Sequence, residues 1–453
     1  MPHDTLVITG AGVVSSIGIG ADEFASGLRE ARTGIIDLLS VPEKLISVCP
    51  VPSSDRPIPG GPVLDFDAKQ YVRPRKALKV MCREIQTAFA ASQLAIDDAG
   101  LRDHLPSVPD STAPGTGIVT SERIGTVFGS EMFYGDPEEM VDAFVDCIND
   151  ANEVEASKFG TAAMRQVVPL WMLKYLPNMP ACHVGIALAA LGPNNTLTLG
   201  DVSGPAALYE GVGYLRRGIA DVVVVTACGT RLNTTRSVFT EDQPIAAAAS
   251  PIERSCRPHA DDADGIVRGE AAAGLILEPA AFAKDRGHKP IAEVLGVTSR
   301  FIPSRAFRSG DRSASRDADA GRGSTSAIVR SIQDALSEHG VAAEEIGLVV
   351  SHGMGDPVLD RAERDAISEC LPDIPVCIPE SSLGHTGACS GMIGLVTAVE
   401  AIRHRTVFPV AHASECDGTI NVSATPRKLE QPYVLAIAHT SPGSATAVLL
   451  RQS

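Results

Sequence analysis

The chain has 453 residues, of which 44% are hydrophobic and 21% charged, as expected for a protein with a large buried core. Its formal net charge of −16 argues against nucleic-acid binding through a basic surface, so an acidic protein partner would need a local basic spot. The start, MPHDTLVITGAG, lacks the layout of a secretory signal, and no run reaches the roughly 18 apolar residues of a membrane span, so we expect a cytoplasmic protein.

Strand-like runs rich in β-branched residues alternate with helical patterns along the chain. We expect strands at 6–14, 124–130, 220–229, 271–278, 346–353 and 445–451, and helices at 76–99, 205–217, 326–339 and 391–404. Near-continuous apolar strands are typical of sheets covered on both faces, so the alternation predicts a layered α/β protein. We predict surface loops at 40–62 and 304–325, and a division of the chain near residue 280.

The stretch NTLTLGDVSGPAAL, residues 195–208, predicts a strand, a tight turn and the start of a helix. Such a turn presents one side chain at a helix N-terminus, where catalytic nucleophiles are often placed. The side chain here is Asp201, a poor nucleophile. The stretch therefore indicates either an active site with an unusual residue or the remains of one.

Two histidines follow short predicted strands. His352 stands in SHGMGDP, where a buried strand ends, and His385 stands in GHTGACSG, after the short strand PVCIP. We expect the two imidazoles to converge over one pocket. A third segment, DADGIVRGEAAAG, contains Glu270 and indicates a tight turn that feeds a strand.

The ten cysteines are scattered, without a C-x-x-C pair or a histidine spacing typical of zinc. We therefore expect reduced, buried cysteines and no metal site. Cys228, in TACG, follows ADVVVV and is interpreted as a packing residue on a core strand.

Five motifs in order make the chain resemble the β-ketoacyl-acyl carrier protein synthases, the condensing-enzyme branch of the thiolase-like proteins. They are VITGAGVVSSIG, LPNMPACHVGIALAALGPNNT, RPHADDADGIVRGEAAAG, HGMGDPVLDRAERDAI and GHTGACSG. The resemblance implies a five-layer αβαβα fold of two similar halves, here residues 1–280 with the turn at Asp201 and residues 281–453 with both histidines. It also implies a dimer, an acyl carrier protein as partner and no cofactor.

In that family a cysteine holds the acyl chain and two histidines assist decarboxylation of malonyl-carrier protein. The resemblance carries the histidines onto His352 and His385 and the cysteine onto Asp201. Supporting positions in the same motifs fall on Glu270 and Glu363.

Further departures from the family pattern surround the same pocket. The family's lysine before the second histidine is Glu380, and the phenylalanine that gates the pocket is Pro442, followed by Gly443. The remaining exchanges are Met354 and Asp356 for two threonines and Thr446 for an asparagine. Together they indicate that ordinary condensation has been lost or rerouted.

The chemistry of Asp201 leaves several functions open. Attack by its carboxylate on a thioester would give an easily hydrolysed mixed anhydride, so the chain should not store an acyl group. A carboxylate between two histidines should instead raise the pKa of both.

The first hypothesis is a chain-length-factor-like partner of a Cys-containing ketosynthase, which would make a heterodimer rather than a homodimer. The alternatives are a malonyl-carrier decarboxylase, another acyltransferase with Asp201 or Glu380 as general base, and an unusual condensing enzyme.

Overall fold

The computed structural model describes residues 5–41, 56–106, 117–233, 235–236, 243–309, 321–416 and 418–453. Ten strands in this part follow one another side by side across a large sheet. In spatial order they are β11 (Val376–Cys377), β10 (Ile346–Val350), β14 (Tyr433–His439), β15 (Ser444–Gln452), β9 (Ala292–Phe301), β1 (Leu6–Ser15), β8 (Arg268–Pro279), β7 (Val222–Thr230), β5 (Ile124–Gly129) and β6 (Asn194–Leu197). The short strands are β2 (Gly18–Ile19), β3 (Ile36–Asp37), β4 (Pro59–Gly61), β12 (Thr406–Val407) and β13 (Arg427–Lys428).

The order of the strands repeats between the two halves of the sheet. In β6-β5-β7-β8-β1 the first two pairings are parallel and the next two antiparallel. The set β11-β10-β14-β15-β9 has the same sequence of pairings. The halves join where Val7 and Ile8 of β1 pair with Glu293 and Ala292 of β9. This repeat confirms the predicted two similar halves, while a domain boundary at residue 280 stays a prediction.

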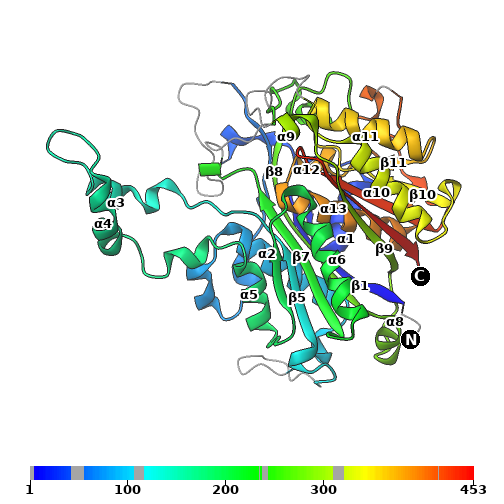
Figure 1. Cartoon of the computed structure of the whole chain (residues 1–453), viewed down its shortest axis with the longest axis horizontal. Coiled ribbons are helices and arrows are strands. Elements are labelled where there is room, and N and C mark those ends of the chain that lie inside the picture. Colours follow the sequence, from blue (N-terminus) through cyan, green and yellow to red (C-terminus); the bar gives the residue numbers. More distant parts are fainter. Residues whose placement is uncertain are drawn as a thin grey trace.

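Helices cover the two halves and fill the space between them. Those in the described part are α1 (Ala21–Arg29), α2 (Arg83–Asp98), α3 (Val141–Val145), α4 (Phe159–Gln166), α5 (Met179–Ala187), α6 (Ser203–Arg216), α8 (Ala280–Asp285), α9 (Arg305–Ser309), α10 (Thr325–Ser337), α11 (Pro357–Cys370), α12 (Glu380–Leu383) and α13 (Ser390–His404). Helices α6 and α13 lie in the central layer, α2 and α5 cover the first half, and α10 and α11 cover the second (Figure 1). The predicted αβαβα layering is thus confirmed.

Of the two central helices, α13 lacks the polar face of a surface helix. Every residue of α13 from Ser390 to Ile402 is buried, and all of them are apolar or small except Glu400, which pairs with Arg403. The two helices also begin in direct contact. A Cβ atom added to Gly204 would lie 2.8 Å from Cβ of Met392, so this crossing requires glycine. The turns that precede α6 and α13 are therefore brought together.

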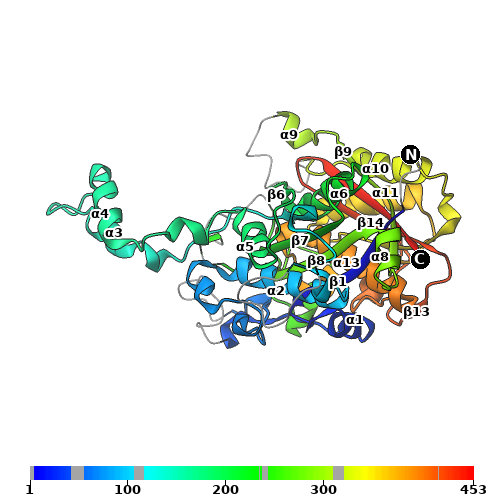
Figure 2. The ribbon, with the colours of Figure 1, turned by 90° about the horizontal axis from the view of Figure 1, so that it is seen from below.

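A long excursion leaves the body after β5 and returns before α5. We call residues 131–178 the arm; it carries α3 and α4, which stand away from the body in both views (Figures 1 and 2). Glu139 holds the base of the arm by accepting hydrogen bonds from Trp171, Lys174 and Tyr175 at 2.6 to 2.7 Å. The sequence patterns did not predict this arm.

Most predicted elements are confirmed within a few residues. The strand expected to end near Gly200 ends at Leu197, and the helix expected from residue 76 begins at Arg83 after a 3-10 turn. The segment around Glu270 is already part of β8 rather than a turn. Strands β9 and β14 were not predicted.

The two predicted loops lie partly outside the described residues, at 42–55 and 310–320. Their described flanks contain β4 and α9. The nine cysteines in the described ranges form no disulfide with one another; five of them are buried and four are half-buried, and Cys49 falls outside these ranges. None of the helices described is long and apolar enough to cross a membrane.

Candidate active site

Asp201 occupies the turn between β6 and α6, as the sequence predicts. Gly200 has a φ of +65°, a left-handed conformation that favours glycine, and a 3-10 turn spans Gly200–Val202. The hydroxyl of Ser203 accepts a hydrogen bond from the amide of Leu199 and donates one to the carbonyl of Gly200. These contacts fix the turn and place the buried Asp201 side chain just before the first turn of α6.

His352 follows β10 in a turn that two carboxylates of α11 hold in place. Glu363 accepts hydrogen bonds from the amides of His352 and Gly353, at 2.8 and 2.9 Å. Asp360 accepts those of Met354 and Gly355. Glu363 therefore supports the histidine turn through backbone amides, and its Oε2 atom also lies 3.3 Å from Nε2 of His439.

His385 lies in the turn between α12 and α13, tied to the edge of β8. Its amide donates to the carbonyl of Val267 at 2.7 Å, and its carbonyl accepts from the amide of Gly269 at 3.0 Å. Gly384 before it has a φ of +77°. The second half of the chain is thus anchored on a strand of the first half at this histidine.

The three side chains meet, as the sequence predicts. Oδ1 of Asp201 lies 3.2 Å from Nε2 of His385 and 3.6 Å from Nη2 of Arg231. One nitrogen or oxygen atom from each of Asp201, His352 and His385 lies within 4.8 Å of the other two. All three residues are buried.

Within the cluster, the pKa values of Asp201 and His385 shift in opposite directions. Burial by itself would raise the pKa of Asp201, but the contact with His385 and the charges of His385 and Arg231 hold it well below its usual range. Burial would lower the pKa of His385, and the charge of Asp201 reverses this, so the pKa is raised. Asp201 and His385 therefore form a buried ion pair when the imidazole is protonated.

The pKa of His352 is lowered, although we expected the pKa values of both histidines to be raised. Burial and the neighbouring His439 lower the pKa of His352 to about 3. The ring of His439 lies edge-on to that of His352, with centroids 5.0 Å apart. The prediction of a raised pKa is correct for His385 and wrong for His352, where burial and the charge of His439 outweigh the opposing charge of Asp201.

A metal ion does not suit this cluster, although two imidazoles and a carboxylate can bind one. Nδ1 of His352 accepts the backbone N–H of His439 at 3.4 Å. In a neutral imidazole the proton then sits on Nε2, which becomes a hydrogen-bond donor instead of a ligand. His352 is thus prepared to donate to an oxygen atom.

A buried network of charges lies directly beside Asp201. Glu131 contacts Arg231 at 3.4 Å and Arg236 at 2.9 Å, and these side chains are about nine-tenths buried. Arg231 packs over the turn of His385, because a Cβ atom on Gly387 would lie 2.9 Å from its guanidinium carbon. An alkyl chain attached at residue 201 would meet these charges on this side.

Glu380 is buried and its pKa is raised to about 8, chiefly by burial and also by the charge of Asp201. Its carboxyl group is therefore mostly protonated at neutral pH.

Two of the departures from the family pattern are compensated locally. Asp356 caps α11 through the amide of Val358 and forms a buried ion pair with Arg322. Met354 packs with Ile266 and Leu359. These two exchanges belong to packing around the turn rather than to the pocket.

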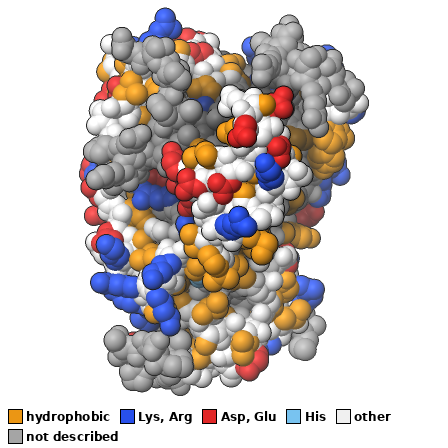
Figure 3. All heavy atoms as spheres, turned by 90° about the vertical axis from the view of Figure 1, so that its left-hand side faces the viewer, with side chains coloured by type: hydrophobic (Ala, Val, Ile, Leu, Met, Phe, Trp, Pro, Cys, Tyr) orange, Lys and Arg blue, Asp and Glu red, His pale blue; other side chains and the backbone are white. Residues whose placement is uncertain are grey.

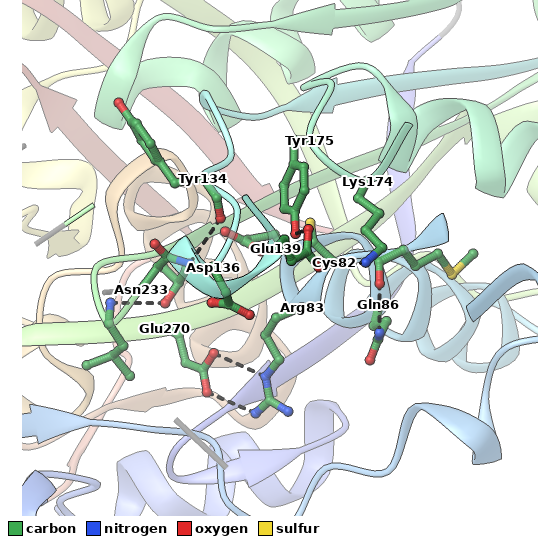
Figure 4. Close-up of a pocket in the computed structure, with 14 residues that line it drawn as sticks. Cys82, Arg83, Gln86, Tyr134, Asp136, Glu139, Lys174, Tyr175, Asn233 and Glu270 are labelled. Carbon is green, nitrogen blue, oxygen red and sulfur yellow. Dashed lines mark hydrogen bonds and ion pairs between the residues drawn. The ribbon is translucent and has the colours of Figure 1, made fainter. Parts of the chain in front are cut away.

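The remaining predicted site residues lie further away. Glu270 pairs with Arg83 at 2.9 Å and lines a separate cavity (Figure 4). Pro442 and Gly443 form the turn between β14 and β15, and this turn binds residues 302 and 304 through backbone hydrogen bonds. Thr440, just before them, is the nearest neighbour of an added Cβ at Gly200, at 3.8 Å. The turn thus lies next to the one that carries Asp201.

Sequence reasoning missed Arg231, Glu131 and His439. Each of them lies at or shortly after the end of a buried strand. A charged or imidazole side chain close to the end of an apolar run such as VVVVTACGT could have indicated these positions. Cys228 in that run is buried in β7, and burial raises the pKa of its thiol, as expected for a packing cysteine.

Models of two domains from one protein family match most of the chain. The model described as "Beta-ketoacyl synthase, N-terminal domain" matches residues 3–283, and the corresponding C-terminal domain matches residues 303–414. The chain belongs to the beta-ketoacyl synthase family. The thiolase-like fold predicted from the five motifs is confirmed with it.

Individual relatives cover nearly the whole chain. A 3-oxoacyl-[acyl-carrier-protein] synthase 2 from Staphylococcus aureus is 24% identical over 432 residues, covering 94% of this chain and 92% of the relative. The protein of the same name from Synechocystis sp. is 28% identical, covering 91% and 89%. Among solved structures, "The ishigamide ketosynthase/chain length factor" aligns over the full length of both chains with a TM-score of 0.75 and 22% identity, which shows the shared fold.

Proposed function

We propose that this chain is a chain-length-factor-like subunit of fatty acid or polyketide biosynthesis, which pairs with a separate ketosynthase that keeps its cysteine. The observation that carries the proposal is Asp201, an ionised carboxylate paired with His385 and Arg231 at the position onto which the family's cysteine is carried. A carboxylate held in this way is a poor acyl acceptor. The partner would hold the acyl chain instead.

The charged network next to Asp201 supports the same reading. Glu131, Arg231 and Arg236 are already buried and paired beside Asp201, and an alkyl chain packed against them would cover polar groups without bonding to them. A subunit that does not carry the chain at its own centre has no need to keep that side apolar.

The arm supports a tight association with another chain. Large hydrophobic side chains are exposed along it, and Figure 3 shows hydrophobic side chains gathered on the face from which it projects. Those on the arm are Met132, Val141, Phe144, Val145, Ile148, Val154, Met164, Val168, Leu170 and Met172. Many large apolar side chains exposed on one segment are typical of protein interfaces.

A basic segment supports contact with an acidic carrier protein. Lys69, Arg73, Arg75, Lys76 and Lys79 are all exposed, although the chain as a whole carries a net charge of −16. Local complementary charge steers association with an oppositely charged partner. We take an acyl carrier protein as that partner.

Co-expression tests the proposal. The chain is produced with the Cys-containing ketosynthase and the carrier protein encoded beside it, purified, and analysed by mass spectrometry. We expect a complex of one copy of each synthase-like chain, with acyl groups on the partner's cysteine and none on this chain. A stable homodimer that excludes the ketosynthase, or an acyl group on this chain, would contradict the proposal.

The second candidate is a malonyl-carrier decarboxylase, favoured by His352 and His385. Loss of CO2 leaves the electron pair on the α-carbon as an enolate, which hydrogen bonds from imidazole N–H groups to the thioester oxygen would stabilise before protonation gives acetyl-carrier protein. This needs no nucleophile on the chain. Incubation with malonyl-carrier protein should then yield acetyl-carrier protein, and product formation that persists in both His352→Ala and His385→Ala would exclude this role.

A further inference from the structure

A cavity of about 350 Å³ lies between the first turn of α2, the two ends of the arm and the end of β7 (Figure 4). Thr230 and Leu232 line this cavity, whereas Arg231 between them extends to Asp201, so the two spaces lie on different sides of the chain after β7. The volume of the cavity is that of a site for a small organic ligand. An occupant would therefore be distinct from anything bound at residue 201.

Negative charge predominates in the lining of the cavity, which holds four carboxylates and two basic groups. They are Glu84, Asp136, Glu139, Glu270, Arg83 and Lys174. Arg83 pairs with Glu270 at 2.9 Å, and Lys174 pairs with Glu139 at 2.7 Å. In the described part of the chain, Glu84 and Asp136 are left without a cation. The cavity thus offers two carboxylates to a positively charged occupant.

Glu84 lies in the first turn of α2 and is only 6% exposed. Its carboxyl group contacts the thiol of Cys82 and its own backbone N–H, but neither of these groups is a cation. Burial raises the pKa of Glu84 to about 7, and the charges of Glu131 and Glu270 act in the same direction. A buried carboxylate is costly without an opposite charge, so a cation that enters the cavity would stabilise the ionised form.

The carboxylates of the cavity do not converge on one point, as the ligands of a metal ion would. Among the described residues, the one group of three or more metal-ligating side chains that meets within 4.8 Å is Asp201, His352 and His385. The cavity therefore does not provide the ligand set of a single divalent cation. Carboxylates that lie apart are suited instead to the two charged ends of an organic dication.

The cavity also has apolar surface for the hydrocarbon part of such a ligand. Met81, Leu232 and the ring of Tyr175 belong to the lining. Methylene groups gain free energy when they leave water for surroundings of this kind. The ring of Tyr175 adds an aromatic face, which attracts ammonium groups.

We propose that this cavity binds a small aliphatic diamine in its doubly protonated form, with one ammonium group directed to Glu84 and the other to Asp136. Glu84 belongs to α2 and Asp136 to the arm, so the ligand would hold the base of the arm against the body of the protein. This site goes beyond the proposed function and does not depend on it.

Three probes of different charge test the site by calorimetry on the purified full chain. They are 1,4-diaminobutane, the neutral 1,4-butanediol of equal length, and magnesium chloride. We expect the diamine to bind with a Kd at least about tenfold lower than that of either other probe, because charge-assisted hydrogen bonds to two carboxylates are stronger than neutral ones.

Glu84→Gln and Asp136→Asn should each raise the Kd of the diamine about tenfold, since each removes one charge-assisted contact. Glu138→Gln is the matched control, because Glu138 is an exposed carboxylate of the arm that does not line the cavity. It removes the same charge and should leave the Kd unchanged. Thermal unfolding of each variant shows that the fold is retained.

The pH dependence gives a second measurement that a merely structural role of Glu84 would not produce. A cation favours the ionised carboxyl group, so binding should release a proton, and the affinity of the wild type should increase about tenfold between about pH 6 and about pH 8. The other groups that face Glu84 keep their charge, because the raised pKa of Cys82 keeps its thiol protonated and Glu131 and Glu270 pair with arginines. In Glu84→Gln the increase should disappear.

Failure of the diamine to bind would overturn the inference, and so would equal or tighter binding of the diol or of magnesium. A loss of affinity in Glu138→Gln as large as in the two cavity variants would show attraction to the acidic surface in general and also overturn it. Binding that is indifferent to Glu84→Gln and Asp136→Asn would place the diamine elsewhere, with the same consequence. No partner chain enters these measurements, so their failure leaves the proposed pairing with a ketosynthase untouched.

Discussion

Nε2 of His385 lies 3.2 Å from Oδ1 of Asp201, and this contact joins the two halves of the chain at the candidate active site. Both residues are buried, so the pair is shielded from solvent. The folded-state pKa of His385 is raised above its ordinary value of 6.5. Its contribution to stability is therefore complete below about pH 6.5 and is lost as the pH rises through the folded-state pKa.

Asp201→Asn should lower the pKa of His385, because burial then acts on the imidazole without the opposing carboxylate. The measurement is a titration of the histidine ring resonances by NMR in both proteins. Burial lowers the pKa of His412 to about 4, and Asp201 is not among the groups that influence it. His412 should therefore titrate as before. An unchanged or raised pKa of His385 would show that Asp201 does not set its charge.

Glu380→Gln should change how stability depends on pH. In the wild type the folded carboxyl keeps its proton up to about pH 8, whereas an unfolded one releases it near 4.5, so stability falls as the pH rises between these values. The variant has no such carboxyl group. Its free energy of unfolding relative to that of the wild type should therefore increase from pH 5 to 8 and then level off. Chemical unfolding at a series of pH values measures the difference, and parallel curves would disprove the assignment.

Asp201→Cys should not restore condensation. The thiol would stand beside Arg231 and the Glu131 network, which leave no apolar path for an alkyl chain on that side. We expect no ketoacyl product above background when the variant is supplied with acyl- and malonyl-carrier protein and the products are analysed by mass spectrometry. Robust product from this single change would show that the thiol alone is missing.

Charges placed on the arm should prevent association. Phe144 and Met164 are 54% and 89% exposed, so Met164→Glu should leave the thermal stability of the isolated chain nearly unchanged, while Phe144→Glu should lower it slightly through the lost ring contact with Phe159. Co-purification of the partner chain should fall at least about tenfold, because a charge in an apolar interface is costly to desolvate. Phe307→Glu is the control, since Phe307 is 57% exposed on α9, away from the arm. Equal complex yields for all three variants would exclude the arm as the interface.

Reversal of the basic segment should weaken carrier binding. In the double variant Arg75→Glu and Lys76→Glu, two exposed cations become anions, so the affinity for an acidic carrier should fall about tenfold at low ionic strength and the loss should shrink with added salt. Surface plasmon resonance measures this. Lys284→Glu, an exposed exchange on α8, should have little effect. A similar loss in this control would mean that net charge, and not the segment, governs binding.

The layered fold, the turn at Asp201 and the convergence of His352 with His385 were all predictable from sequence patterns. Strand and helix patterns depend on neighbours a few residues apart, and glycines such as Gly200 and Gly384 mark turns that only a few backbone conformations allow. The ordered motifs then placed these turns in a family whose halves pack in one way.

The charge state of the site and the surfaces around it depend on contacts between distant parts of the chain. The pKa of His352 depends on burial and on His439, and that of Asp201 depends on His385. These residues come from segments far apart in the chain. The arm and the polar cavity likewise depend on contacts such as Glu139 with Lys174 and Glu270 with Arg83. Electrostatic interactions and burial act through space between segments far apart in the chain, so no local pattern carries them.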